Sequence, residues 1–287
     1  MKAQSRQTLV LLIFAVLAFL AGCTSEQLPN PLDTRLERRL VELSPDGSLD
    51  YFRLPDSETA LGAVPAGVGN PLTREKIELG RMLFFETGLA ADAMHEGGKG
   101  TYSCGSCHVP SAGFMPGAKQ GIADGGVGFG QNGESRGKLI DYAEEELDVQ
   151  GARPLSVLNT AFVTNSTWSG KFGANHVNKG TEHAWVGDAE VNERGLDGLE
   201  AQIIEGLALH RMRVTIGWLD TLGYLPMYDA AFADFPEGDR YSPLTTSFAL
   251  SAYLRSLTTT EAPFQRWVLG EENAMSDQEK AGAMVFF

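Results

Sequence analysis

Apolar and polar residues along this chain recur with the period of α-helices far more often than with the alternation of strands. The segment that starts near residue 70 predicts a helix. Thr73 is suited to cap its N-terminus, and Ile77, Gly80, Arg81 and Phe84 then fall on one face. A glycine next to an aromatic residue on that face suits a helix that another helix crosses closely.

Two later segments predict further helices, over residues 196–212 and 247–257. The second has Phe248, Ala252 and Leu254 among its apolar positions. Strand patterns are sparse, and residues 111–138 form a glycine-rich loop, which we interpret as a mobile flap. We therefore predict an all-α fold with long loops and insertions.

The first 22 residues have the pattern of a lipoprotein signal peptide. Lys2 and Arg6 precede an apolar run from Leu9 to Leu20, which is too short for a comfortable membrane span. The run ends in Leu-Ala-Gly-Cys, so cleavage would leave Cys23 at the N-terminus with a lipid on its sulfur. An uncleaved anchor helix is the alternative. We expect a periplasmic protein held by this lipid at a membrane, the outer membrane in particular, with residues 23–50 as a tether.

The end of the chain repeats an earlier segment. Residues 80–85 read Gly-Arg-Met-Leu-Phe-Phe, and residues 282–287 read Gly-Ala-Met-Val-Phe-Phe, 202 positions later. Both copies close an amphipathic helix rich in Glu and Lys. This predicts one domain over residues 51–270 and the beginning of a second over residues 271–287, with Met284, Val285, Phe286 and Phe287 left exposed or misdocked.

The charge of the chain excludes one class of partner. The net charge is −14, and removal of residues 1–22 takes away Lys2 and Arg6 but no acidic residue, which gives −16. Nucleic acid is therefore not an expected partner, because phosphates require Lys and Arg. A basic protein partner is compatible with this charge.

The strongest chemical signal is Cys104-Gly105-Ser106-Cys107-His108. Two thiols at this spacing followed at once by His are the attachment pattern of c-type haem, in which both thiols form thioethers and the His binds iron. A redox-active dithiol would require a thioredoxin-like context, and structural zinc would require four ligands. The motif therefore predicts one covalent haem c in this chain, with His108 as the iron ligand.

Together these segments resemble the bacterial di-haem cytochrome c peroxidases, a family that includes MauG, the enzyme that matures methylamine dehydrogenase. The resemblance covers residues 50–287. It rests on Pro71-Leu72-Thr73, Leu79 to Phe85, Ser103 to His108, Gly113-Phe114, Leu158 to Phe162 and Trp168-Ser169-Gly170.

The resemblance implies two cytochrome c-like domains. The haem of the N-terminal domain reduces hydrogen peroxide, and the second haem receives electrons from a small c-type cytochrome or a cupredoxin. It places Trp168 between the two haems, and a homodimer is compatible with it. With the internal repeat, it predicts that the chain stops before a second haem motif, so that two haems belong to the full-length protein and turnover by this chain is slow.

The chain departs from the family in three places. The family's calcium ligand, an Asn, would stand where Arg153-Pro154-Leu155 stand, which argues against calcium. The loop after the motif has no distal His, since no His lies between His108 and His176, so we expect the iron to be open at rest.

The third departure is at the family's distal Glu, which precedes a Met that aligns with Met212; Arg211 stands there instead. Reduction of peroxide requires a proton-moving base and a cation or dipole that supports O–O cleavage. We therefore predict His210 as the base and Arg211 as the cation, with a packing role for His210 as the alternative.

Two other functions stay open from the sequence. One is a mono-haem electron carrier, in which Met115, Met212 or Met227 would fill the sixth position on iron. The other is a MauG-like oxidase of a protein side chain.

Overall fold

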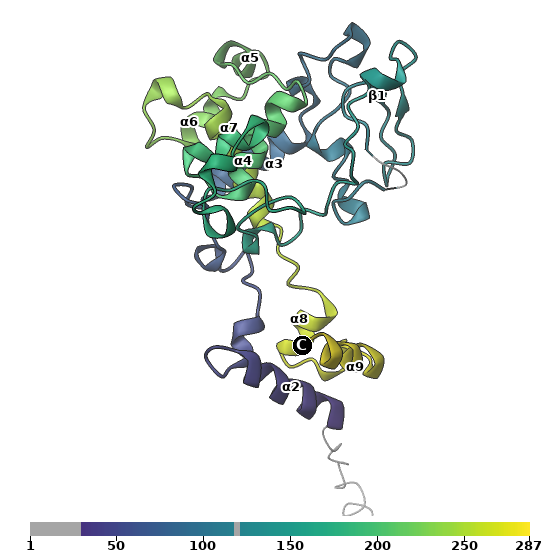
Figure 1. Cartoon of the computed structure of the whole chain (residues 1–287), viewed down its shortest axis with the longest axis vertical. Coiled ribbons are helices and arrows are strands. Elements are labelled where there is room, and N and C mark those ends of the chain that lie inside the picture. The colour runs from purple at the N-terminus through teal and green to yellow at the C-terminus, as the bar shows by residue number, and fades with distance from the viewer. Residues whose placement is uncertain (1–29, 118–120) are drawn as a thin grey trace, which may run out of the picture. The chain divides into compact units, whose positions relative to one another are not determined.

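The computed structural model describes residues 30–117 and 121–287, which form two compact units (Figure 1). The larger unit is Leu54–Ala262, and the smaller one combines residues 30–53 with Pro263–Phe287. The expected signal peptide and Cys23 lie outside the described residues. Within the described residues, none of the helices combines the length and the apolar character needed to cross a bilayer.

The larger unit is built on three helices that pack side by side (Figure 1): α3 (Arg74–Phe85), α4 (Gly198–Leu209) and α7 (Pro243–Ser256). Two short helices, α5 (Ile216–Thr221) and α6 (Leu225–Ala231), connect α4 to α7. In the described residues the only sheet is a two-residue antiparallel pair, β1 (Gly126–Val127) with β2 (Gly137–Lys138). The prediction of an all-α fold is confirmed.

Helix α3 forms and packs as its sequence predicts. Thr73 accepts a hydrogen bond from the backbone N–H of Lys76 at 3.2 Å, which makes it the N-cap. At Gly80 the backbone of α7 comes so close that a Cβ atom would lie 1.9 Å from the carbonyl oxygen of Ala249. Only glycine allows this crossing, which places the aromatic end of α3 against the haem motif.

A buried polar network that the sequence did not reveal joins these helices. Arg255 of α7 binds Glu200 of α4 through Nη2 and Oε2 at 2.8 Å, and both side chains are almost fully buried. Asn70 donates to Glu200 at 3.3 Å and accepts from the Nζ atom of Lys76 at 3.1 Å. Since a buried charge is costly without its partner, removing any one member should destabilise the unit.

The smaller unit contains α2 (Pro31–Leu43), α8 (Pro263–Val268) and α9 (Asp277–Phe286). Its core consists of Leu36, Leu40, Trp267, Val268 and Met275. In place of a tether throughout residues 23–50, the structure has a helix from Pro31. The reason is the four-residue spacing of Leu36 and Leu40, which creates an apolar stripe that is buried against the other end of the chain.

The C-terminal repeat does form a helix, but it is only partly exposed. Val285 and Phe286 are 89% and 83% exposed, whereas Met284 and Phe287 pack against the core of the smaller unit. A buried ion pair between Lys280 and Asp33, 2.6 Å from Nζ to Oδ1, binds α9 to α2. The larger unit runs from Leu54 to Ala262, whereas the sequence predicted a domain over residues 51–270.

Candidate haem site

The haem motif forms one tight turn. Cys104–Ser106 is a single turn of 3₁₀-helix, and the backbone N–H of His108 donates to the carbonyl oxygen of Cys104 at 2.9 Å. Ser106 closes the turn by accepting the backbone N–H of Ser103 at 2.9 Å. The two thiols are free and not joined in a disulfide.

His108 is held with one ring nitrogen satisfied. Its Nδ1 atom lies 3.0 Å from the carbonyl oxygen of Phe114, to which it donates, so Nε2 is left to bind a metal. Phe114 has a left-handed φ of 57°, which the turn at Gly113-Phe114 requires in order to point this carbonyl back at the imidazole. Burial lowers the pKa of His108, which favours the neutral form that ligates metals.

The end of α3 covers the motif with two aromatic rings. The Phe84 ring lies 6.5 Å from the His108 ring and 6.0 Å from that of Phe114, centroid to centroid. Phe85 lies over Gly105, where a Cβ atom would come within 2.7 Å of its ring. The close approach explains a glycine at the first position between the two cysteines.

The environment of the thiols argues against the two alternatives for this motif. Burial raises the pKa of Cys104 to about 12 and that of Cys107 to about 11. A redox-active dithiol requires a lowered pKa. Zinc would need further ligands, and the described residues hold no group of three or more His, Cys, Asp or Glu side chains suited to a metal. Two free thiols and one correctly oriented imidazole fit haem c.

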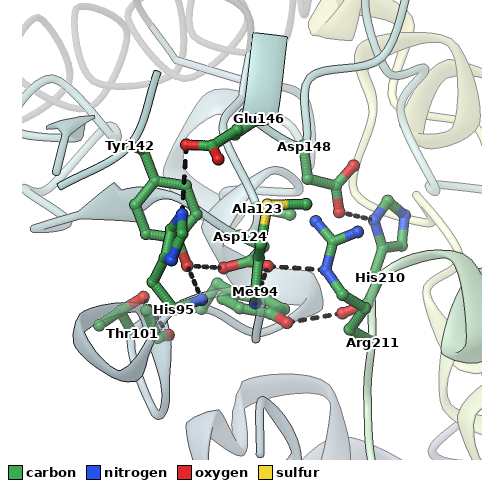
Figure 2. Close-up of polar contacts among 12 residues, drawn as sticks. Met94, His95, Thr101, Ala123, Asp124, Tyr142, Glu146, Asp148, His210 and Arg211 are labelled. Carbon is green, nitrogen blue, oxygen red and sulfur yellow. Dashed lines mark hydrogen bonds and ion pairs between the residues drawn. The ribbon is translucent and has the colours of Figure 1, made fainter. Parts of the chain in front are cut away.

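The structure brings His210 and Arg211 together with two carboxylates at the C-terminal end of α4 (Figure 2). The Nδ1 atom of His210 lies 2.6 Å from Oδ2 of Asp148, and Nε of Arg211 lies 2.7 Å from Oδ2 of Asp124. Arg211 has a left-handed φ of 52°, which turns its side chain away from that of its neighbour. These two consecutive residues therefore contact different carboxylates, His210 that of Asp148 and Arg211 that of Asp124.

Asp124 is the most buried member of this group, with no exposed surface. It accepts hydrogen bonds from the Tyr142 hydroxyl at 2.5 Å, the Met94 backbone N–H at 2.8 Å and Arg211. Burial by itself raises the pKa of Asp124, but these donors outweigh it, and the pKa lies below its ordinary value. The carboxylate is therefore ionised beside Arg211.

This group is connected to the haem motif by direct contacts. The Tyr102 hydroxyl donates to the carbonyl oxygen of His210 at 2.7 Å, and Tyr102 stands two residues before the first cysteine. Cys107 and Met212 both pack against the small apolar cluster that contains Tyr102. The predicted base and cation therefore lie beside the segment that leads into the haem motif.

Other predicted residues are placed differently. Trp168 lies on a loop and is 94% exposed, and it is not among the residues that contact His210 or Arg211 in the described part of the chain. Met227 packs in the main core, and Met115 is partly exposed directly after the Phe114 turn. At the place of the family's calcium ligand, Arg153 donates through Nη2 to the carbonyl oxygen of Pro116 at 2.6 Å.

The carboxylates were missed by sequence reasoning. Asp124 stands in Ile-Ala-Asp-Gly-Gly, and Asp148 stands two residues after a run of three glutamates, so both have the appearance of ordinary loop residues. Tyr142 is likewise a single aromatic residue in a polar loop. No local pattern marks residues whose partners lie 62 and 87 positions away.

Comparison with known proteins shows which family the chain belongs to. The family model described as di-haem cytochrome c peroxidase matches residues 74–273, which include the haem motif, His210 and Arg211. The chain belongs to the di-haem cytochrome c peroxidase family. The resemblance inferred from the motifs is thereby confirmed, as is the cytochrome c-like fold.

Curated relatives within the family have two kinds of name. The methylamine utilization protein MauG of Methylorubrum extorquens is 30% identical over 82% of this chain and 51% of its own length. The protein of the same name from Methylophilus methylotrophus is 28% identical, over 83% of this chain and 54% of its own. The cytochrome c peroxidase Ccp of Escherichia coli is 24% identical, over 75% of this chain and 36% of its own. The chain spans about half the length of the MauG relatives.

The family is one of haem-dependent oxidoreductases, and membership implies covalently bound haem c. The family contains both cytochrome c peroxidases and MauG proteins.

Proposed function

We propose that the mature protein carries one haem c on Cys104 and Cys107, with His108 as iron ligand, and reduces hydrogen peroxide to water. The electrons would come from a small periplasmic c-type cytochrome or cupredoxin. When bound, the haem supplies the redox centre for this reaction. The observation that carries the proposal is the Asp148–His210 pair, which sits beside Arg211 and is bonded to the segment before the haem motif.

His210 is suited to move a proton between the two oxygens of peroxide. Its Nδ1 atom donates to Asp148, whose side chain is only 8% exposed, so the other nitrogen, Nε2, is left as the proton acceptor. Nε2 would take a proton from the near oxygen and return it to the far oxygen as the O–O bond breaks. This is the role of a general base that becomes a general acid.

Arg211 is suited to support the charge that develops on the departing oxygen. Its guanidinium is always protonated and is only 30% exposed, so its field is less screened by water than that of a surface arginine. It thereby takes the place in this chain of the acid that the family has before the aligned methionine. Two electrons and two protons per peroxide then give two waters.

The experiment that tests this proposal is the reaction of ferric holoprotein with peroxide, followed by stopped-flow absorbance. His210→Ala should react about 10²–10⁴-fold more slowly, the range for loss of a general base. His183→Ala is the matched control, because His183 is an exposed histidine of the same unit. Reaction of His210→Ala at the parental rate would reject the assignment. A low-spin ferric spectrum with no reaction would instead favour an electron carrier.

A second candidate is MauG-like oxidation of a protein side chain. Two relatives named MauG are 28% and 30% identical to the chain, and Trp168 is an almost fully exposed aromatic residue through which electrons could reach the haem domain. If Trp168 relays electrons from that side chain, Trp168→Phe should slow the peroxide-dependent oxidation of the protein substrate and leave the first reaction with peroxide at the parental rate. Equal turnover of the variant and the parent would remove Trp168 from the mechanism.

A further inference from the structure

Two carboxylates on neighbouring backbone segments hold two consecutive residues of the candidate site. The backbone N–H of Asp148 donates to the carbonyl oxygen of Asp124 at 3.0 Å, and that of Ala123 donates to Asp148 at 2.9 Å. The carboxylates are thus fixed to each other through the backbone, and His210 and Arg211 are bound one to each. The relative placement of base and cation is therefore set by the pair of segments.

The contact between Asp124 and Arg211 uses only part of the guanidinium. Asp124 binds Nε, and the two terminal nitrogens form no hydrogen bond with any residue that the structure describes. Figure 2 shows the guanidinium between Asp124 and the Asp148–His210 pair. An arginine held for structure alone usually offers its terminal nitrogens to a carboxylate or to carbonyl groups. Arg136 of this chain does so, since it binds four backbone carbonyl oxygens.

Asp124 is held in place by groups other than Arg211. The Tyr142 hydroxyl binds Oδ1, and the Met94 backbone N–H binds Oδ2. Tyr142 is fixed in turn, because its hydroxyl oxygen accepts the backbone N–H of His95 at 3.1 Å. The carboxylate is therefore a rigid, fully buried support for a side chain whose free end is partly open to solvent.

We propose that Asp124 is a positioning residue. It accepts a hydrogen bond from Nε of Arg211 and so directs the two terminal nitrogens, Nη1 and Nη2, to form an anion-binding fork beside His210. The inference rests on the proposed function, in which the fork would receive the departing oxygen of peroxide. It also makes a claim that needs no peroxide: small anions that bind the ferric haem should be stabilised by the same fork. Fluoride is a suitable probe because it is a small, strong hydrogen-bond acceptor.

The experiment is a fluoride titration of ferric holoprotein at fixed pH, followed by absorbance, on a double-mutant cycle of Asp124→Asn and Arg211→Lys. Each single variant should bind fluoride about tenfold more weakly, the loss expected for one charge-assisted hydrogen bond. Lysine lacks the Nε–H group that donates to Asp124 and the two terminal nitrogens that form the fork. Asp124→Asn should therefore weaken binding no further in the Arg211→Lys background.

Asp92→Asn is the matched control. Asp92 binds Arg213, two residues beyond Arg211, but this pair is exposed, with 46% of the Asp92 side chain in solvent. Fluoride affinity should be unchanged in this variant. The melting temperature of every variant is measured as well. If Asp124 had only a structural role, Asp124→Asn would lower the melting temperature, and its effect on fluoride binding would be the same with Arg or Lys at position 211.

Two results would overturn the proposal: an unchanged fluoride affinity in Asp124→Asn, or an equal loss in both backgrounds. If Asp124→Asn does not retain haem, Arg211→Lys decides alone, because it keeps the Tyr142 and Met94 bonds to Asp124. Parental fluoride affinity in Arg211→Lys would then refute the fork. Failure of the peroxidase proposal is read separately, from the reaction of His210→Ala with peroxide.

Discussion

The hydroxyl of Tyr102 donates to the backbone carbonyl of His210 across 108 residues of sequence. One end of this bond is two residues before the first haem cysteine, and the other is the C-cap residue directly after α4. The bond uses the last turn of α4, where carbonyl groups have no partner within the helix. It ties the position of the candidate base to that of the haem motif.

Asp148→Asn should impair the proposed peroxide reaction nearly as much as removal of His210. An amide can donate to Nδ1, which would put the imidazole proton on Nε2 and leave no acceptor facing the substrate. We expect a fall of about 10²–10⁴-fold in the stopped-flow rate, with thermal stability close to that of the parent. A parental rate would show that the tautomer of His210 does not matter.

Replacement of both motif cysteines by alanine should abolish covalent haem. Intact-protein mass spectrometry of the parent should show one haem per chain, which acid–acetone does not extract. Single variants at Cys104 or Cys107 should keep haem through the remaining thioether in lower yield. Undiminished covalent haem in the double variant would contradict the assignment.

Gly80→Ala and Gly282→Ala test the internal repeat at equivalent positions. A Cβ at Gly80 would lie 1.9 Å from the Ala249 carbonyl oxygen, whereas nothing lies within 4 Å of one at Gly282. The first change should destabilise the larger unit by about 1–3 kcal/mol or more through overpacking. The second should stabilise α9 by up to about 1 kcal/mol, because alanine favours helix. Urea unfolding followed by circular dichroism measures both, and a parental stability of Gly80→Ala would show that α3 and α7 can move apart.

The stability contributed by Asp124 should be lost in acid. Its burial raises the pKa, but the hydrogen bonds from Tyr142, Met94 and Arg211 bring it below the ordinary value of 3.8. A group with a depressed pKa stabilises the folded state above its unfolded pKa and loses this contribution as pH falls through the folded pKa. The free energy of unfolding should therefore differ most between the parent and Asp124→Asn at neutral pH, and the difference should shrink below about pH 3.8. A difference that is constant from pH 7 to pH 3 would contradict this.

Cys23 should carry a lipid in the mature protein. The Leu-Ala-Gly-Cys junction motivates this prediction, and the residue lies outside the described part of the chain. Mass spectrometry of the N-terminal peptide should find a diacylglyceryl group on the sulfur, and Cys23→Ser should appear in the soluble periplasmic fraction. An unmodified Cys23 in membrane-bound protein would refute the lipid.

Sequence alone determined the features whose cause is local. The spacing of Cys104, Cys107 and His108 is complete within one turn, so the haem chemistry could be read without a fold. The Thr73 cap and the apolar face of α3 are likewise properties of one short segment. The same local reasoning failed for residues 31–43. The apolar stripe of Leu36 and Leu40 stabilises a helix there only because residues of α8 and α9, from the other end of the chain, cover it.

Only the tertiary structure decided which charged residues meet. Asp148 reaches His210 over 62 positions and Asp124 reaches Arg211 over 87, while Asp33 and Lys280 come from opposite ends of the chain. Such pairs leave no periodic signal, because each carboxylate lies in a loop whose course is set by packing elsewhere. The sequence therefore predicted His210 and Arg211 as candidate base and cation, but the carboxylates that contact them are revealed only when folding brings distant backbone segments together.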